Sequence, residues 1–322
     1  MYNEIGRKIT DKLIEIYGPD MKIAFFPYKR SMWNSMQSVY DECKASGIEA
    51  HCVPIPYYRM GPGQTVDHID SDFDLFGPIA ESVSVLEGLK LDCIAIQYQY
   101  ENHNRVTNML PEYFTMAIKE RYNCDIIYLP YGIGSGGASS HFILQPGVCN
   151  VDYAFLETEA NADRFIREWQ KVGVDFTGRV FVYGSPKLDI VGNLTTEIPE
   201  KWEYIIDGRS VTLIANSLGP FLVDPLGRIS LYKDKARAEV AAGRAVIFRP
   251  HPLLRTTIKS MQTIPEYRYD QMLEDMKRFG HVIIDESEYL ERAFGICDKM
   301  LSDSPSLVPM WAATGKPYEV LG

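Results

Sequence analysis

Short apolar runs alternate with amphipathic stretches along most of this chain, and this alternation restricts the fold more than any single motif does. The apolar run 22–27 predicts a buried strand. Residues 31–46 have the spacing of a helix that Gly47 ends, and residues 49–55 predict the next strand. A strand, a helix and a strand in this order form a βαβ unit, which implies a parallel sheet with a right-handed crossover.

The alternation continues to about residue 191 and resumes after a polar, proline-containing stretch at 192–203. We therefore predict an α/β protein with two Rossmann-like, doubly wound domains, residues 1–191 and 192–322, that face each other across a cleft. This is the architecture of the GT-B glycosyltransferases. Besides those given above, the expected strands are 93–97, 125–129, 151–156, 179–183, 211–215, 245–248, 282–284, 299–301 and 317–321. The expected helices are 5–17, 79–86, 111–121, 158–171, 232–242, 269–279, 288–294 and 305–314.

The composition excludes several classes of protein. A hydrophobic content of 46% and a charged content of 24% are typical of a globular protein. The net charge of −10 argues against a general nucleic-acid binder, which would present a basic surface. No run approaches the roughly 18 apolar residues of a membrane span, and the N-terminal residues do not resemble a signal peptide. The six cysteines are scattered without a C-x-x-C motif. They predict buried thiols in a reducing cytoplasm rather than disulfides or a zinc site.

A serine-rich turn near the C-terminus is the first candidate site. The apolar residues before Ser302 predict a strand, Asp303 and Ser304 form a turn, and Pro305 is expected to open a helix with Ser304 as its N-cap and Ser306 nearby. Hydroxyls and free N–H groups would then converge at the positive end of the helix dipole, which favours phosphate. The alternative is that these serines only cap the helix.

A histidine between two prolines is the second candidate. The apolar run 245–248 ends in Arg249, Pro250, His251 and Pro252. Two prolines fix the backbone and cannot continue a central strand, so they hold His251 and Arg249 at the carboxyl end of the strand. Ligands bind at this edge in open α/β sheets, and this favours a ligand contact over a purely structural histidine.

Two loops of the first half are also candidates. Residues 56–77, rich in Tyr, Gly, Pro and Asp, predict a long loop, and Lys29 and Arg30 follow an earlier strand. The glycine-rich stretch after residue 129 does not have the G-x-G-x-x-G spacing of a dinucleotide-binding turn, so we interpret it as flexible backbone near a ligand. Its candidate contacts are Tyr131, Gly132, Gly134 and His141.

Four motifs together resemble the CDP-glycerol glycerophosphotransferase family, the teichoic-acid polymerases. G-S-P-K-L-D at 184–189 is similar to the family's G-x-P-R-x-D, and R-P-H-P-L-L at 249–254 is similar to its R-x-H-P motif. L-S-D-S-P-S at 301–306 resembles its serine motif, and G-K-P at 315–317 falls where the family has a small residue before K-P. Bacterial polysialyltransferases share an H-P and a serine motif.

The resemblance implies a metal-independent transfer from a CDP-activated donor to the hydroxyl of a polyol or glycan acceptor, at the inner face of the membrane or in the cytoplasm. His251 and Arg249 would contact the donor phosphates, and Ser302, Ser304 and Ser306 would receive them. It also places Asp303, Gly184 and Ser185 on the nucleotide side, and Gly132, Gly134, Lys29 and Arg30 on the acceptor side.

The chain departs from the family at the expected base. The family carries W-H-G-T-P after a strand of the first domain, whereas this chain has P-Y-G-I-G at 130–134, so Tyr131 stands in place of the histidine. Tyrosine titrates near pH 10 and is a poor base at neutrality. His141 and Asp189 are the alternative bases. The chain also ends on an expected strand rather than a helix, which is typical of a truncated or short family member.

Two other functions fit the same architecture. One is a sugar-nucleotide enzyme such as a UDP-sugar transferase or a 2-epimerase, which would need acids and a histidine in the cleft, and Asp92, Glu101 and His103 are its candidates. The other is a catalytically silent nucleotide binder. We expect no metal site, because Asp298 and Asp303 lie five residues apart across an extended strand and turn and would point apart.

Overall fold

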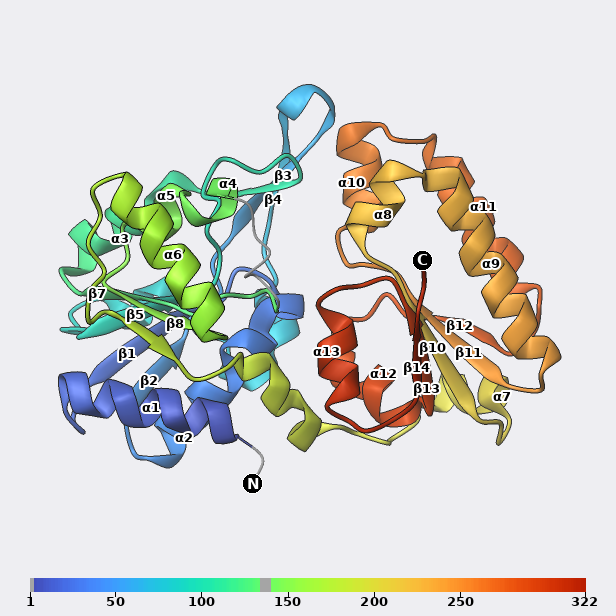
Figure 1. Cartoon of the computed structure of the whole chain (residues 1–322), viewed down its shortest axis with the longest axis horizontal. Coiled ribbons are helices and arrows are strands. Elements are labelled where there is room, and N and C mark those ends of the chain that lie inside the picture. Colours follow the sequence, from blue (N-terminus) through green and yellow to red (C-terminus); the bar gives the residue numbers. More distant parts are fainter. Residues whose placement is uncertain (1–2, 134–139) are drawn as a thin grey trace. The chain divides into compact units, whose positions relative to one another are not determined.

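The structure is a computed structural model that describes residues 3–133 and 140–322, and the chain folds into two compact units. The first unit comprises Met1–Arg59 and Val66–Gly192, and the second comprises Met60–Thr65 and Asn193–Gly322. Each unit has its own parallel sheet (Figure 1). No helix in the described part of the chain has the length and hydropathy of a membrane span.

The first unit is built on a six-stranded sheet in the order β2-β1-β5-β7-β8-β9, and every neighbouring pair is parallel. Hydrophobic side chains alternate between its two faces. Phe25 and Ala95 pack with α1 and α2, whereas Ile94 and Ile126 face α3 and α6. The strands are β1 (Lys22–Phe26), β2 (Glu49–Cys52), β5 (Cys93–Ile96), β7 (Asp125–Tyr128), β8 (Tyr153–Leu156) and β9 (Val180–Val182).

Helices cover both faces of this sheet, with α1 and α2 on one side and α3, α5 and α6 on the other (Figure 1). Helix α1 closely approaches α2, since a Cβ on Gly6 would lie 2.6 Å from the backbone of Ser38. Thr158 caps α6 by accepting a hydrogen bond from the Asn161 N–H. The helices are α1 (Glu4–Tyr17), α2 (Gln37–Ala45), α3 (Thr115–Tyr122), α4 (Ser140–Ile143), α5 (Pro146–Cys149) and α6 (Glu159–Lys171).

The expected long loop at 56–77 is wrong in part, because this region contributes to a second, three-stranded sheet. Strand β3 (Tyr57–Met60) lies between β4 (Val66–Asp70) and β6 (Thr107–Met109), and it pairs with β6 in antiparallel fashion. The proline- and glycine-rich composition concealed these short strands. The expected helix at 79–86 is also wrong, since only a 3-10 turn at Val83–Leu86 forms there.

The second unit has a five-stranded parallel sheet in the order β12-β11-β10-β13-β14. Helices α8 to α11 bury residues such as Phe221, Tyr232 and Ile258 on one face. Trp202 of α7 and Trp311 of α13 are buried in the second unit as well. Figure 1 shows α9 and α11 on one side of the sheet and α12 and α13 on the other. The strands are β10 (Val211–Ala215), β11 (Ala245–Arg249), β12 (Val282–Ile284), β13 (Lys299–Ser302) and β14 (Tyr318–Val320).

The helices of this unit are α7 (Glu200–Ile206), α8 (Leu218–Val223), α9 (Pro225–Ala241), α10 (Leu254–Met261), α11 (Glu266–Lys277), α12 (Leu290–Ile296) and α13 (Leu307–Ala312). Two parallel sheets, each covered by helices, confirm the predicted fold class. The six cysteines are free thiols, of which Cys149 alone is half-buried and the others are buried.

Candidate functional site

The central strands of the second unit end at the same level, and this brings three polar loops to one edge of the sheet. Ala215 of β10 lies in register with Arg249 of β11 on one side and with Ser302 of β13 on the other. Strands in a sheet are about 4.8 Å apart, so the two outer loops are separated by roughly 10 Å. This is the carboxyl edge of the sheet, where open α/β folds bind ligands.

His251 is held firmly at this edge. Its backbone N–H donates to the Oδ1 atom of Asn216 at 2.9 Å, which ties the loop after β11 to the loop after β10. Its ring Nδ1 atom accepts a hydrogen bond from the Leu253 N–H at 3.1 Å. In the neutral ring the proton therefore lies on Nε2. The side chain is half-buried, and a phosphate oxygen is a suitable acceptor for that proton.

The serine loop is held by hydrogen bonds among its own residues, and the helix after it begins later than expected. Helix α13 begins at Leu307 rather than at Pro305, and the Ser304 Oγ atom accepts from the Leu307 N–H at 3.4 Å. Ser302 is fully buried, and its Oγ atom accepts from the Ser304 N–H at 3.0 Å. The Ser304 and Ser306 hydroxyls lie 3.3 Å apart. Ser304 is 3% exposed, so Ser306 is the most accessible of the three serines.

Asp303, which the resemblance places on the nucleotide side, is instead bonded within the second unit. Its carboxylate accepts from the Ser217 N–H at 2.7 Å and from the Tyr232 hydroxyl at 2.5 Å, and Arg228 lies 3.5 Å away. The side chain is 1% exposed. Burial and the adjacent Asp303 carboxylate raise the pKa of the Tyr232 phenol, so Tyr232 remains a hydrogen-bond donor at neutral pH. Asp303 therefore joins two loops and α9.

Arg249 is also turned inward. Its Nη1 atom forms a buried ion pair with Asp285 after β12 and lies 3.4 Å from the Ser287 hydroxyl. The two charged side chains are 7% and 1% exposed. The arginine charge is therefore already matched within the protein. Arg249 positions the loop after β12 beside His251, and the expected contact with donor phosphates has no support from this geometry.

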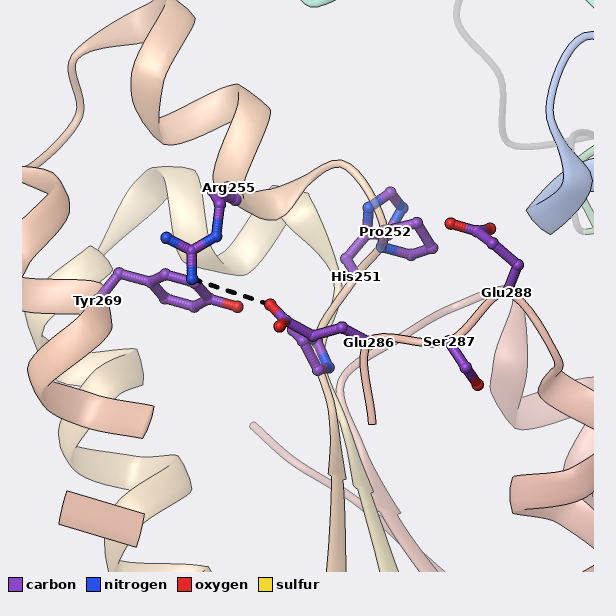
Figure 2. A pocket seen from close by; sticks show the side chains of 8 residues that line it. His251, Pro252, Arg255, Tyr269, Glu286, Ser287 and Glu288 are labelled. Atoms are coloured by element: carbon purple, nitrogen blue, oxygen red, sulfur yellow. Dashed lines mark ion pairs between the residues drawn. The ribbon is translucent and has the colours of Figure 1, made fainter. Parts of the chain in front are cut away.

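A small hollow of about 50 Å³ opens beside His251, between the ends of β11 and β12 and the helices α10 and α11. Figure 2 shows Arg255 and Glu286 pointing toward each other next to the ring of Tyr269. Their charged groups are 3.9 Å apart. The Arg255 guanidinium lies 4.9 Å from the centre of that ring. The remaining lining residues are Pro250, His251, Pro252, Ser287 and Glu288.

The sequence analysis did not identify the residues after β12 and on α10 and α11 that line this hollow. Residues 285–288 read Asp-Glu-Ser-Glu immediately after the apolar strand β12, and Asn216 follows β10 in the same way. A polar group after a buried strand of a parallel sheet is the signal that would have identified them. Arg255 and Tyr269 had no such signal, because they reach the hollow from helices.

In the first unit, Tyr131 packs among other tyrosines after β7. Its ring centre lies 6.3 Å from that of Tyr98, and its hydroxyl is hydrogen-bonded with Tyr100. Burial raises the pKa of the Tyr131 phenol, and the hydrogen bond only partly offsets this shift. A raised pKa makes the phenol less able to act as a base in its ionised form at neutral pH. Gly132 follows it and is half-buried, and Gly134 lies outside the described residues.

The other expected residues of the first unit are dispersed. His141 is exposed on α4, where its ring lies 3.3 Å from the Gln145 Nε2 atom. Lys29 is 3% exposed and donates to the Tyr57 hydroxyl at 2.6 Å, and the Arg30 N–H donates to Asp72 at 2.9 Å. Lys29 and the backbone of Arg30 thus bond to the segment around β3 and β4.

The G-S-P-K-L-D motif joins the end of β9 to the start of α1. Gly184 has a φ of +97°, and a Cβ there would lie 3.0 Å from the Ile5 side chain, so glycine is required. The carboxylate of Asp189 accepts from the Ile5 and Gly6 N–H groups at 3.2 and 2.8 Å. Asp189 is therefore a cap for α1 rather than a base. Ser185 belongs to this first unit and is buried.

We expect Asp189→Ala to cost about 1–2 kcal/mol, the range for losing an N-cap side chain. Two N–H groups at the positive end of α1 would lose their acceptor. Chemical denaturation and hydrogen exchange of the first turn of α1 measure the effect. Asp11→Ala, an exposed position on the same helix, is the matched control. Equal stability of the two variants would contradict the capping role.

Two pairs of acidic residues lie at opposite ends of a strand: Asp92 and Glu101, the candidates for a 2-epimerase cluster, and Asp298 and Asp303, which the sequence predicted to point apart. Asp92 precedes β5 and accepts from the Lys22 N–H, whereas Glu101 follows β5 and accepts from the Thr115 N–H. Asp298 precedes β13 and Asp303 follows it. Within residues 3–133 and 140–322, no group of three His, Cys, Asp or Glu side chains is arranged to hold a metal ion.

Comparisons with known proteins identify the fold. No protein-family model and no curated protein matches the chain. The UDP-GlcNAc 2-epimerase from Neisseria meningitidis, solved with UDP-GlcNAc, is similar with a TM-score of 0.58 at 15% identity, over 94% of this chain and 82% of that one. The enzyme from Methanocaldococcus jannaschii gives 0.55 at 16% identity, over 92% and 83%. The wall teichoic acid polymerase TagF gives 0.46 at 13% identity, over 97% and 73%.

At these identities the comparisons show a shared fold. The two epimerase structures cover most of both chains, so the whole chain has the α/β architecture of those enzymes. The likeness to TagF is too weak to carry an argument. The chemistry must therefore be argued from the residues of this chain.

Proposed function

We propose that this chain is an enzyme that binds a nucleotide-activated donor through its second unit and transfers part of that donor to an acceptor hydroxyl. The observation that carries the proposal is the carboxyl edge of the second sheet, where His251 is fixed by Asn216 and lies at the same edge as the serine loop. The epimerase-like fold of the whole chain and the four sequence motifs support it.

The donor would lie along the strand ends. The His251 Nε2 proton would bind one phosphate, and the hydroxyls of Ser304 and Ser306 would bind the other. Carboxylates accept hydrogen bonds from ribose hydroxyls, and Glu286 and Glu288 line the hollow next to His251. In this arrangement a leaving phosphate is stabilised by hydrogen-bond donors, which lowers the barrier to transfer.

The finer proposal is a CDP-linked donor and transfer of glycerophosphate or a similar group to a polyol or glycan during cell-surface polymer synthesis. The four motifs at 184–189, 249–254, 301–306 and 315–317 support it. Tyr131 does not favour it, because its raised pKa makes it a poor replacement for the family's histidine base. Glycerol is thus the least supported part of the proposal.

Calorimetry with CDP, CMP, UDP and UMP tests the nucleotide site. His251→Ala and Ser304→Ala should each weaken nucleotide diphosphate binding by about 1–3 kcal/mol, the range for losing a hydrogen bond to a charged group. Ser230→Ala, on the exposed side of α9, should leave binding unchanged. We expect EDTA to have no effect, since no group of three His, Cys, Asp or Glu side chains within residues 3–133 and 140–322 is arranged to hold a metal ion.

The nucleotide preference measured by calorimetry distinguishes between the candidate functions. A preference for cytidine supports the CDP-linked donor, and a preference for uridine supports a sugar-nucleotide enzyme of the epimerase or UDP-sugar transferase kind. Unchanged affinity in both site variants, measured on folded protein, would refute the donor site. A requirement for Mg²⁺ or Mn²⁺ would refute the metal-independent mechanism.

A further inference from the structure

A buried lysine of the first unit, Lys187, has no anionic partner among the residues that the structure describes. Lys187 follows β9 in the G-S-P-K-L-D motif and is 9% exposed. Among the residues that the structure describes, no hydrogen bond or ion pair is made by its ammonium group. The segment 134–139, G-S-G-G-A-S, contains no carboxylate that could supply one. A buried charge without a partner is costly, and such a group is a candidate for a functional site.

The Lys187 ammonium group lies close to aromatic side chains at the carboxyl edge of the first sheet. Its Nζ atom lies 6.0 Å from the centre of the Tyr131 ring, although Lys187 follows β9 and Tyr131 follows β7. Strand β8 lies between these two strands, so the lysine reaches across the carboxyl edge of the sheet toward its middle. Tyr98 and Tyr100 pack beside Tyr131. The ammonium therefore stands against an aromatic surface at the edge where such sheets bind ligands.

A second polar group of the same motif also has no hydrogen-bond partner among the described residues. The Ser185 hydroxyl, two residues before Lys187, is buried and has no hydrogen-bond partner among the described residues. Buried hydroxyls without a partner are rare in native proteins. One ligand with oxyanion acceptors would satisfy both groups. The tyrosine rings suit the apolar face of the polyol or sugar that carries the oxyanion.

We propose that Lys187 and Ser185 form an oxyanion-binding site on the first unit, which takes the phosphate or carboxylate group of a polyol or sugar. The further identification of this ligand as the acceptor rests on the proposed function, whereas the anion site itself does not.

The protonation of Lys187 is compatible with this role. Burial lowers the pKa of the Lys187 ammonium from 10.5 to about 8, with no charged neighbour contributing. Tyr131, whose own pKa is raised, is the titratable group that faces it among the described residues. The ammonium form therefore still predominates at pH 7, where it can bind an anion, and it is lost as the pH rises through about 8.

Calorimetry with glycerol 3-phosphate, glycerate and inorganic phosphate tests the site, in a His251→Ala background that weakens anion binding by the second unit. We expect Lys187→Met to weaken binding of the preferred ligand at least tenfold and Ser185→Ala to weaken it about three- to tenfold. Lys171→Met, whose lysine is 64% exposed in the same unit, is the matched control. Tighter binding of glycerol 3-phosphate than of glycerate identifies phosphate as the group, and the reverse identifies carboxylate.

Sulfate, whose charge does not change between pH 6 and 9, isolates the titration of the lysine. Its affinity should fall above about pH 8 in the parent protein and stay constant in Lys187→Met. Equal affinities of Lys187→Met and Lys171→Met for every anion would overturn the proposal, as would normal binding in Ser185→Ala together with a pH-independent sulfate affinity. Nucleotide affinity of Lys187→Met with His251 intact reports on the donor site separately, so either claim can fail while the other stands.

Discussion

Replacing Arg249 by methionine is expected to destabilise the second unit by about 3–5 kcal/mol, the range for removing one partner of a buried ion pair. The Arg249 and Asp285 side chains are 7% and 1% exposed, so water cannot solvate the carboxylate that remains. The Ser287 hydroxyl would lose its contact with the guanidinium as well. The loop after β12, which lines the hollow beside His251, should then become less ordered.

The control for this prediction is Arg255→Met. Arg255 also forms ion pairs, with Asp270 at 2.7 Å and Glu286 at 3.9 Å, but its side chain is 45% exposed. Pairs in contact with solvent contribute at most about 1 kcal/mol. Chemical denaturation combined with hydrogen exchange of the second unit compares the two variants. A loss no larger than that of Arg255→Met would show that the pair does not stabilise the unit.

A double variant identifies the cause of the loss. Arg249→Met together with Asp285→Leu removes both charges and leaves two apolar side chains in the same volume. It should recover most of the stability, because the cost in Arg249→Met arises from an unpaired carboxylate rather than from missing contacts. If the double variant is as unstable as the single one, packing of the guanidinium is responsible instead.

The strands were predictable because their signal is local. A run such as 245–248 is apolar at every position, as expected for a strand covered on both faces, and the observed strand is Ala245–Arg249. Parallel register then places the residues after β10, β11 and β13 at one edge. This is why sequence alone could locate His251 and the serine loop near each other.

The partners of the buried charges were not predictable. Asp285 lies 36 residues from Arg249, Tyr232 lies 71 residues from Asp303, and Gly6 lies 183 residues from Asp189. No local pattern records such pairings, because they depend on how loops pack after the sheet has formed. Sequence reasoning therefore treated Arg249 and Asp303 as ligand contacts, although the structure uses them to hold loops together.

Lys187→Met is expected to have the opposite effect to Arg249→Met and to stabilise the protein by about 3 kcal/mol at pH 7. The pKa of the Lys187 ammonium falls from 10.5 in the unfolded chain to about 8 in the folded protein, and each unit corresponds to about 1.4 kcal/mol. Below pH 8 the folded protein carries the full cost of the buried charge. Between pH 8 and 10.5 the unfolded chain binds more protons, so the stability of the parent protein rises with pH.

The advantage of Lys187→Met should therefore shrink as the pH is raised from 7 to 10, because the folded parent protein then has an uncharged side chain at this position. Denaturation at several pH values measures the difference, and Lys171→Met should show none. A lower stability of Lys187→Met, or an advantage independent of pH, would contradict an unpaired buried ammonium.

Phosphate should stabilise the parent protein more than the variant, because an anion bound to Lys187 compensates the same charge that methionine removes. If Lys187 lowers the stability of the protein until an anion binds, its role is in anion binding rather than in folding.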